Sequence, residues 1–201
     1  MIHAVAPRLL KTLLPVAALA TLAGCVSLGN EPPPTLLTLT ATAAPAEGDA
    51  TTGTERTALT VLEPSAPQRL AITRVPVQID DANIAYLKDA VWVEKPTRLF
   101  RRLLSETVRA RTGRVVIDGF DATIATEDQL RGSLVEFGYD ARSSSVVVVF
   151  DALRDAEGNR IVSRRFRSTV PGIAAEAGPV GDALNRAAND VAGQVAEWIA
   201  Q

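Results

Sequence analysis

Few residues in this chain of 201 have side chains suited to chemistry. The sequence holds one cysteine, Cys25, and one histidine. Two pairs of aspartates stand in segments with the composition of loops, Asp80 with Asp81 and Asp118 with Asp121. Paired carboxylates can hold a cation or divide the roles of general acid and general base. Neither pair has the ligand number of a calcium loop, so we interpret both as turn-forming aspartates.

Cys25 follows the sequence Leu-Ala-Gly at 22–24, and this stretch resembles a bacterial lipobox, in which the thiol is diacylated and the chain is cut just before it. Residues 1–24 have the layout of a secretory signal, a short basic segment and then an apolar run. That run is about ten residues long, whereas a bilayer-spanning helix needs roughly 20, which argues against a retained signal anchor. An ordinary signal peptide containing a cysteine is the other alternative, but an unpaired thiol in a secreted protein needs an explanation. We therefore predict lipidation, with palmitate among the acyl chains, at Cys25.

Removal of residues 1–24 takes away His3, Arg8 and Lys11 and leaves 19 basic against 23 acidic residues, a net charge of −4. A mildly acidic domain without a basic block is a poor nucleic-acid binder. The mature chain has no imidazole, and acylation uses its only thiol, which excludes His-based triads, His-containing zinc sites and a cysteine nucleophile. We therefore predict that the protein is not an enzyme and has no cofactor or metal.

The surface residues that could recognise a partner are arginines at helical spacing within 98–112. A basic helix face can meet acidic lipid headgroups or a partner protein, and the alternative is a merely solvated face. We interpret Trp92 and Trp198 as core or interface residues rather than as a stack for a ligand. The candidate partner or lipid-headgroup surface consists of Arg98, Arg101, Arg102 and Arg109.

The segment that precedes the folded domain is rich in Pro, Thr, Ala and Gly over residues 25–68. Such a composition buries too little apolar surface to offset the entropy of ordering, so we predict a flexible tether. Fully extended, about 40 residues reach on the order of 130 Å. Within the tether, the leucine-rich segment 36–40 has the pattern of a short edge strand.

Residues 69–201 are predicted to form one α+β domain, a two-layer sandwich in which a mostly antiparallel sheet of four to six strands packs against two main helices. The first helix is expected over 98–112, with Thr97 as its N-cap and Gly113 as its left-handed stop. Apolar residues at helical spacing predict the second over 180–199. Extended segments are expected at 69–77, 84–87, 90–93, 114–117, 129–141, 146–153 and 160–169. Both registers of 129–141 carry apolar residues, which indicates either a bulge or a strand covered on both faces.

The residues before the first helix carry a more specific pattern. A strand at 70–76 is followed by Ile84, Tyr86, Trp92, Glu94 and Pro96, and then by the apolar face of the helix. This pattern resembles the ABC-type transport auxiliary lipoprotein family, whose members include the lipoprotein subunits of paraquat-inducible and related MCE lipid-transport systems. The resemblance covers roughly 36 to 200. The early Tyr-x-Leu strand of the family is Leu-Thr-Leu here.

The resemblance implies a non-catalytic periplasmic lipoprotein that acts as a docking or scaffolding component. Its partners would be an MCE-domain protein and an ABC permease and ATPase, and the cargo would be phospholipid or another apolar molecule moving between the membranes of a Gram-negative envelope. Val26 follows Cys25 in place of the aspartate that retains enterobacterial lipoproteins in the inner membrane, which indicates the periplasmic face of the outer membrane. A homo-oligomer is compatible with this role.

Two alternatives come from other functional classes. A structural lipoprotein that assists lipopolysaccharide or β-barrel assembly in the outer membrane would share the anchor and the fold, and would bind a β-barrel partner. A carboxylate-dependent glycan hydrolase would need Asp118 and Asp121 to flank a cleft. The accessory subunit is the leading hypothesis because of the family resemblance, and the lack of an imidazole and a free thiol in the mature chain fits a non-catalytic role.

Overall fold

The computed structural model describes residues 33, 35–119, 121, 123–124, 126–156 and 160–201. The predicted signal peptide and the predicted lipidation of Cys25 lie outside these residues. Within them, neither helix has the length and apolar character that a membrane crossing requires.

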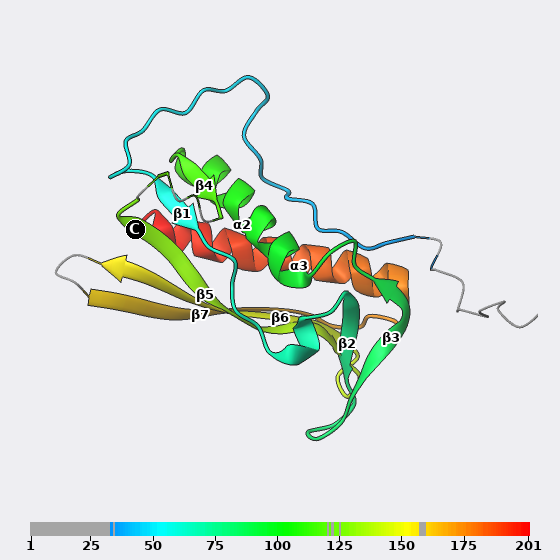
Figure 1. Ribbon diagram of the computed structural model, residues 1–201. Coiled ribbons are helices and arrows are strands. Elements are labelled where there is room, and N and C mark those ends of the chain that lie inside the picture. The colour runs from blue at the N-terminus through cyan, green and yellow to red at the C-terminus, as the bar shows by residue number, and fades with distance from the viewer. Residues whose placement is uncertain (1–32, 34, 120, 122, 125, 157–159) are drawn as a thin grey trace, which may run out of the picture. The chain divides into compact units, whose positions relative to one another are not determined.

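Two helices cover one face of a curled, mixed sheet of seven strands (Figure 1). The helices are α2 (Pro96–Thr112) and α3 (Ala177–Ile199). The predicted α+β class with two main helices is therefore confirmed. The strands are β1 (Leu59–Val61), β2 (Arg74–Gln78), β3 (Ile84–Val91), β4 (Val116–Asp118), β5 (Asp128–Asp140), β6 (Ser145–Ala156) and β7 (Arg160–Val170), and a short 3-10 helix, η1, spans Gln68–Leu70.

The long strand β5 organises the sheet. On one side it pairs antiparallel with β6, which pairs antiparallel with β7. On its other side β5 pairs parallel with β1 at one end and parallel with β2 at the other. β1 also pairs parallel with β4, and β2 pairs antiparallel with β3. The sheet therefore has one strand more than the predicted range and three parallel pairings, all of which involve β1 or β2.

The folded domain begins before residue 69, which corrects the predicted extent of the tether. Leu59 and Val61 of β1 are fully buried between β4 and β5. Further upstream, Leu37 bridges to Trp92, and hydrogen bonds join its N–H to the carbonyl of Val91 and its carbonyl to the N–H of Val93. These contacts are made with residues much later in the chain, so the local composition of 25–68 could not indicate them.

The hairpin formed by β2 and β3 differs in detail from the prediction. The segment 69–77 divides into η1 and β2, and Pro76 lies inside β2 at a register irregularity instead of ending it. The two extended pieces at 84–87 and 90–93 form a single strand up to Val91, in which Asp89 adopts a left-handed φ of 58°.

The start of α2 also corrects one prediction, and its end confirms another. The N-cap is Lys95, and Pro96 takes the first helical position, where its missing N–H costs nothing. Thr97 therefore lies inside the helix, and its hydroxyl donates to Glu63 Oε1 at 2.6 Å. Gly113 ends the helix with a φ of 64°, as expected from a left-handed stop.

The core lies between the helices and the sheet. Aromatic rings pack within this core: the ring centres of Trp92 and Phe137 lie 5.5 Å apart, and those of Phe100 in α2 and Phe150 in β6 lie 5.2 Å apart. Such tilted and edge-to-face pairs stabilise a core beyond the area that they bury. The register of β5 shifts after Leu134, which confirms the bulge, the first of the two alternatives predicted for this strand.

Candidate functional site

The basic face of α2 carries the four arginines of the candidate surface, and each lies beside an acidic side chain. Arg98 pairs with Glu63 after β1, with 3.6 Å between Nε and Oε2. Arg102 pairs with Glu94, which lies between β3 and α2. The Arg98 and Arg102 side chains are 58% and 50% exposed. The outer part of the face is therefore accessible to a partner, but its charge is partly neutralised.

The other two arginines lie closer to the sheet. Arg101 Nη1 is 3.3 Å from Asp118 at the end of β4. Arg109 donates to Glu106 Oε1 at 2.5 Å and to the carbonyl of Val116 in β4 at 2.8 Å. Their side chains are only 20% and 26% exposed. Arg101 and Arg109 therefore fasten α2 to β4, and they contribute less to the accessible surface than the spacing indicated.

The aspartates of the second acid pair make separate local contacts. Besides its ion pair, Asp118 accepts a hydrogen bond from Ser105 Oγ at 3.0 Å. Asp121 accepts bonds from the hydroxyl and the backbone N–H of Thr123, which hold the pKa of its carboxyl below the ordinary value. Within the part of the chain that the structure describes, no three His, Cys, Asp or Glu side chains gather in a way that could hold a metal.

The first acid pair shapes the tip of the β2–β3 hairpin. Asp80 accepts bonds from the backbone N–H groups of Ala82 and Asn83 and from the Asn83 amide. The bond from Ala82, followed by the bond from the Asn83 side chain, lowers the pKa of Asp80. Asp80 is thus the turn-forming residue that the sequence suggested, and it gives the hairpin a defined tip.

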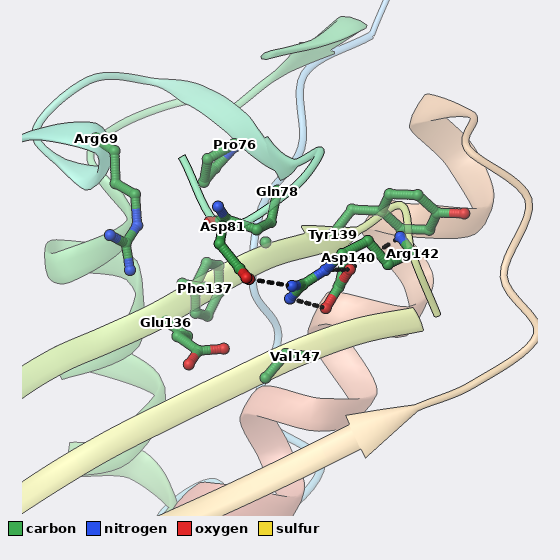
Figure 2. A pocket seen from close by; sticks show the side chains of 11 residues that line it. Arg69, Pro76, Gln78, Asp81, Glu136, Phe137, Tyr139, Asp140, Arg142 and Val147 are labelled. Carbon is green, nitrogen blue, oxygen red and sulfur yellow. Dashed lines mark hydrogen bonds and ion pairs between the residues drawn. The ribbon is translucent and has the colours of Figure 1, made fainter. Parts of the chain in front are cut away.

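Its neighbour Asp81 lines a cavity of about 250 Å³ between β2 and β5. Figure 2 shows Arg142 between two carboxylates at one side of this cavity. Arg142 Nη1 lies 2.6 Å from Asp81 Oδ1, and its Nη2 lies 3.0 Å from Asp140 Oδ2. The hydrogen bond from Arg142 holds the pKa of Asp140 below its ordinary value. The ion pairs tie the hairpin tip to the turn between β5 and β6.

The rest of this cavity is lined by Arg69, Gln78 and Glu136 together with apolar and backbone groups of β2, β5 and β6. A Cβ added at Gly138 would meet the Pro76 carbonyl at 2.5 Å, so glycine is what allows β2 and β5 to approach. Arg69 donates from Nη2 to the carbonyl of Val135 at 2.7 Å, beside the β5 bulge. Arg69 and Arg142 thus join the segments on either side of β2 to β5.

The residues of the family motif divide between core and surface. Trp92 is 1% exposed and Pro96 is buried, so these two position α2 against the sheet. Ile84 is 42% exposed and Tyr86 is partly exposed, with the Arg74 guanidinium 5.1 Å from the ring centre. The ion pair of Glu94 with Arg102 joins the motif to the basic face of α2, a link that the sequence did not reveal.

A contact that sequence reasoning missed holds residues 35–42, which we call the strap, against α3. Figure 1 shows this segment, in blue, passing along α3. The Asn189 amide accepts bonds from the N–H and hydroxyl of Thr42 at 2.8 and 3.0 Å and donates to the Thr40 carbonyl at 2.9 Å. Asn185 Oδ1 accepts from the Thr40 N–H at 2.9 Å.

One turn earlier on α3, Gly181 leaves space for Leu37, because a Cβ added there would lie 2.6 Å from Leu37 Cδ2. Gly181, Asn185 and Asn189 recur at four-residue spacing on one side of the helix, and we call them the clamp. A signal for the clamp did exist in the sequence, since two asparagines four residues apart interrupt an otherwise Ala- and Val-rich helix. Asn189 is 9% exposed, and a buried amide requires partners.

The strap and α2 border a second hollow, of about 320 Å³. Its apolar lining comes from Leu39 and Ala41 of the strap, Leu99 and Leu103 of α2, and Val93. Charged side chains of the Glu94–Arg102 pair stand beside these apolar groups. The hollow therefore brings the family motif, the basic face and the strap together.

Comparison with known structures identifies the fold. The crystal structure of protein XCC0632 from Xanthomonas campestris, described with the family model DUF330, matches with a TM-score of 0.64 at 19% identity. The match covers 83% of this chain and 95% of that one. The crystal structure of an uncharacterized protein matches with a TM-score of 0.62 at 18% identity and covers 74% of this chain and 95% of that one. At these identities the likeness concerns the fold.

No curated protein matches the chain. The family model described as "ABC-type transport auxiliary lipoprotein component" matches residues 37–196, which takes in most of the strap, all seven strands and most of α3. The match begins at the residue that fits against Gly181, so the strap is part of what the family model describes. The chain therefore belongs to the ABC-type transport auxiliary lipoprotein component family, and its general role is that of an accessory lipoprotein of an ABC-type transport system in the cell envelope.

Proposed function

We propose that this protein is a lipid-anchored periplasmic subunit of an ABC/MCE-type system that moves lipid between membranes, and that it docks or scaffolds the other components without catalysing a reaction. The observation that carries this proposal is the family match over 37–196 on a chain whose Cys25 follows a lipobox-like Leu-Ala-Gly. The cargo class is phospholipid or a similarly apolar molecule, and the partners are an MCE-domain protein, a permease and an ATPase.

The arrangement of the domain supports a docking role. The outer arginines of α2, Arg98 and Arg102, stand half exposed beside Glu63 and Glu94. A surface of alternating charges recognises a partner through electrostatic complementarity, which sets specificity and orientation more than affinity. We propose this surface as the contact for a protein partner.

The anchor is proposed to lie in the outer membrane, with the domain on its periplasmic face. Val26 follows Cys25, and the enterobacterial sorting rule retains lipoproteins with aspartate at that position in the inner membrane. Fractionation of cell envelopes tests this part. The wild-type chain is expected with the outer membrane, and the Cys25→Ala chain is expected as a folded, soluble periplasmic protein. Recovery of the wild-type chain only with the inner membrane would contradict the proposed location.

Deletion of the gene tests the transport role. The outer membrane of the deletion strain is expected to admit detergents and large antibiotics, and the wild-type gene is expected to restore the barrier. Reversal of the outer charges by Arg98→Glu together with Arg102→Glu is expected to restore it poorly, because the complementary surface is lost. A barrier unchanged by deletion would contradict a role in lipid transport between the membranes.

A further inference from the structure

The clamp on α3 gives the folded domain a fixed point near its beginning. Leu37 is held on two sides, by backbone hydrogen bonds to Val91 and Val93 and by the space at Gly181. A few residues later, Asn189 binds the backbone of Thr40 and Thr42. The strap is therefore joined to the domain at both Leu37 and Thr40–Thr42.

This fixed point sets how far the domain can stand from its anchor. Residues 26–36 separate Cys25 from Leu37. A chain rises at most 3.3–3.6 Å per residue, so this link spans about 40 Å at most, whatever conformation it takes. If the strap were released from both Val91–Val93 and the clamp, the next residue paired in the sheet would be Leu59, and the limit would be about 120 Å. Attachment of the strap thus shortens the maximal link about threefold.

The surface around the fixed point is apolar and exposed. Leu36 is 55% exposed, and Val93, whose N–H donates to the Leu37 carbonyl, is 51% exposed. Val93 also lines the hollow beside the strap, together with the Glu94–Arg102 pair. Lys95 is exposed nearby and has no acidic partner among the described residues. Apolar side chains beside a cation are the composition that suits an interface with anionic lipid headgroups.

We propose that the end of the domain formed by Leu36, Val93 and Lys95 rests on the lipid bilayer that holds the Cys25 anchor. Because the clamp holds the strap at this end of the domain, residues 26–36 connect the anchor to the same end and so orient the domain on the membrane. The inference rests on the proposed function only in that it takes Cys25 to be the lipid anchor. It adds to that function a membrane-facing surface and a residue-level reason for the length of the link.

The opposite end of the domain provides an internal comparison. There the end of β6 contacts the end of α3, since Arg154 Nη1 donates to the Ile199 carbonyl at 3.2 Å. Gly181 and Ile199 are 18 residues apart on α3, which corresponds to about 27 Å along a helix. Ile161, at the start of β7 beside this end, is 64% exposed and is therefore at least as accessible as Val93. Exposure therefore does not distinguish Val93 from Ile161, but proximity to lipid would.

The experiment uses the full, lipidated chain in vesicles of phosphatidylethanolamine and phosphatidylglycerol at 3:1. Because acylation occupies Cys25, a cysteine introduced by Val93→Cys or Ile161→Cys is the only free thiol and takes a fluorophore selectively. Nitroxide-bearing lipids in the vesicles quench the fluorophore at short range. We expect quenching of the residue 93 label to exceed that of the residue 161 label at least twofold. Adding Gly181→Leu, which displaces Leu37, is expected to reduce this difference, whereas Gly178→Leu, at a position with nothing within 4 Å, is expected to preserve it.

The outcomes separate the inference from the function on which it rests. Equal quenching at both labels, stronger quenching at residue 161, or a difference unaffected by Gly181→Leu in a protein that still unfolds cooperatively would overturn the membrane-facing surface. So would protection of the residue 93 label by a partner protein instead of lipid. If the wild-type chain produced in its native host does not float with the vesicles, and its Cys25 carries no acyl chain, the lipid anchor itself fails.

Discussion

Gly181 of α3 faces Leu37 of the strap, and the glycine is required by the contact, because a Cβ at residue 181 would lie 2.6 Å from Leu37 Cδ2. Residues 144 positions apart in the sequence thus fit together at the place where the family model begins to match. The position of the strap, at the beginning of the folded domain, therefore depends on a glycine in α3, the last helix of the chain.

A larger side chain at residue 181 is predicted to release the strap. Gly181→Leu would force Leu37 away from α3, so its N–H would lose the bond to the Val91 carbonyl and Val93 would lose its bond to the Leu37 carbonyl. Amide hydrogen exchange is expected to accelerate at Leu37 and Val93 while β5 and β6 stay protected. The matched control is Gly178→Leu on the same helix. Unchanged exchange at Leu37 in the Gly181 variant would contradict the contact.

The two asparagines of the clamp are predicted to contribute unequally to stability. Asn189→Ala leaves the Thr42 N–H and the Thr40 carbonyl without their partners in a partly buried site, which costs about 1–3 kcal/mol. Asn185→Ala removes one exposed bond to the Thr40 N–H, and its cost is expected below about 1 kcal/mol. Urea unfolding of both variants measures the free energies, and equal losses would refute the ranking.

Trp92 of the family motif is predicted to act through packing. It is 1% exposed and lies against Phe137, so Trp92→Ala is expected to lower the free energy of unfolding by about 3–5 kcal/mol. Trp198 packs on Phe166 at 5.7 Å but is only partly buried, and Trp198→Ala is expected to cost clearly less. A small loss for Trp92→Ala combined with loss of partner binding would show that Trp92 contacts a ligand instead.

The stability of the sheet is predicted to fall in acid. Hydrogen bonds from Arg165 to Asp151 and from Arg142 to Asp140 hold the pKa of both carboxyls below 3.8 in the folded protein. A lowered folded pKa means that the unfolded chain binds protons first, so the contribution to stability is complete above about pH 5 and is lost as the pH falls through the folded values.

The measurement is the free energy of unfolding between pH 6 and pH 2.5. Asp151→Asn is expected to flatten the acid slope, because the amide does not titrate. Asp182→Asn serves as the control, since Asp182 is exposed and forms no ion pair within the described residues. An acid slope that Asp151→Asn leaves unchanged would exclude this ion pair as a source of the pH dependence.

The elements with local signals could be predicted from the sequence. The helical spacing of Val180, Leu184 and Val191 indicated α3, and the two apolar registers around Leu134 indicated the bulge in β5. The Pro96 and Gly113 positions bracketed α2 to within two residues. These features depend on the spacing of apolar residues and on the intrinsic backbone preferences of proline and glycine, both of which can be read locally in the sequence.

The features that could not be predicted depend on distant residues. β1 is three residues long, and its burial comes from parallel pairing with β4 and β5, which no local pattern encodes. The strap depends on Asn189, nearly 150 positions away. The sequence indicated the four arginines of α2 as one basic face, but the partners Glu63, Glu94 and Asp118 come from other segments. The division into exposed and inner arginines emerged only in the fold.

The central claim, that this lipoprotein is an accessory subunit of an ABC/MCE-type lipid transport system, is tested most directly by the proteins that it touches in the cell envelope. The full chain carrying a C-terminal tag is cross-linked in intact cells, purified from solubilised envelopes and examined by mass spectrometry, with the Arg98→Glu and Arg102→Glu double variant as the matched control. We predict recovery of an MCE-domain protein together with a permease or ATPase, and a reduced yield of these partners with the double variant. Recovery of a β-barrel assembly or lipopolysaccharide-transport protein with no MCE or ABC component would contradict the claim.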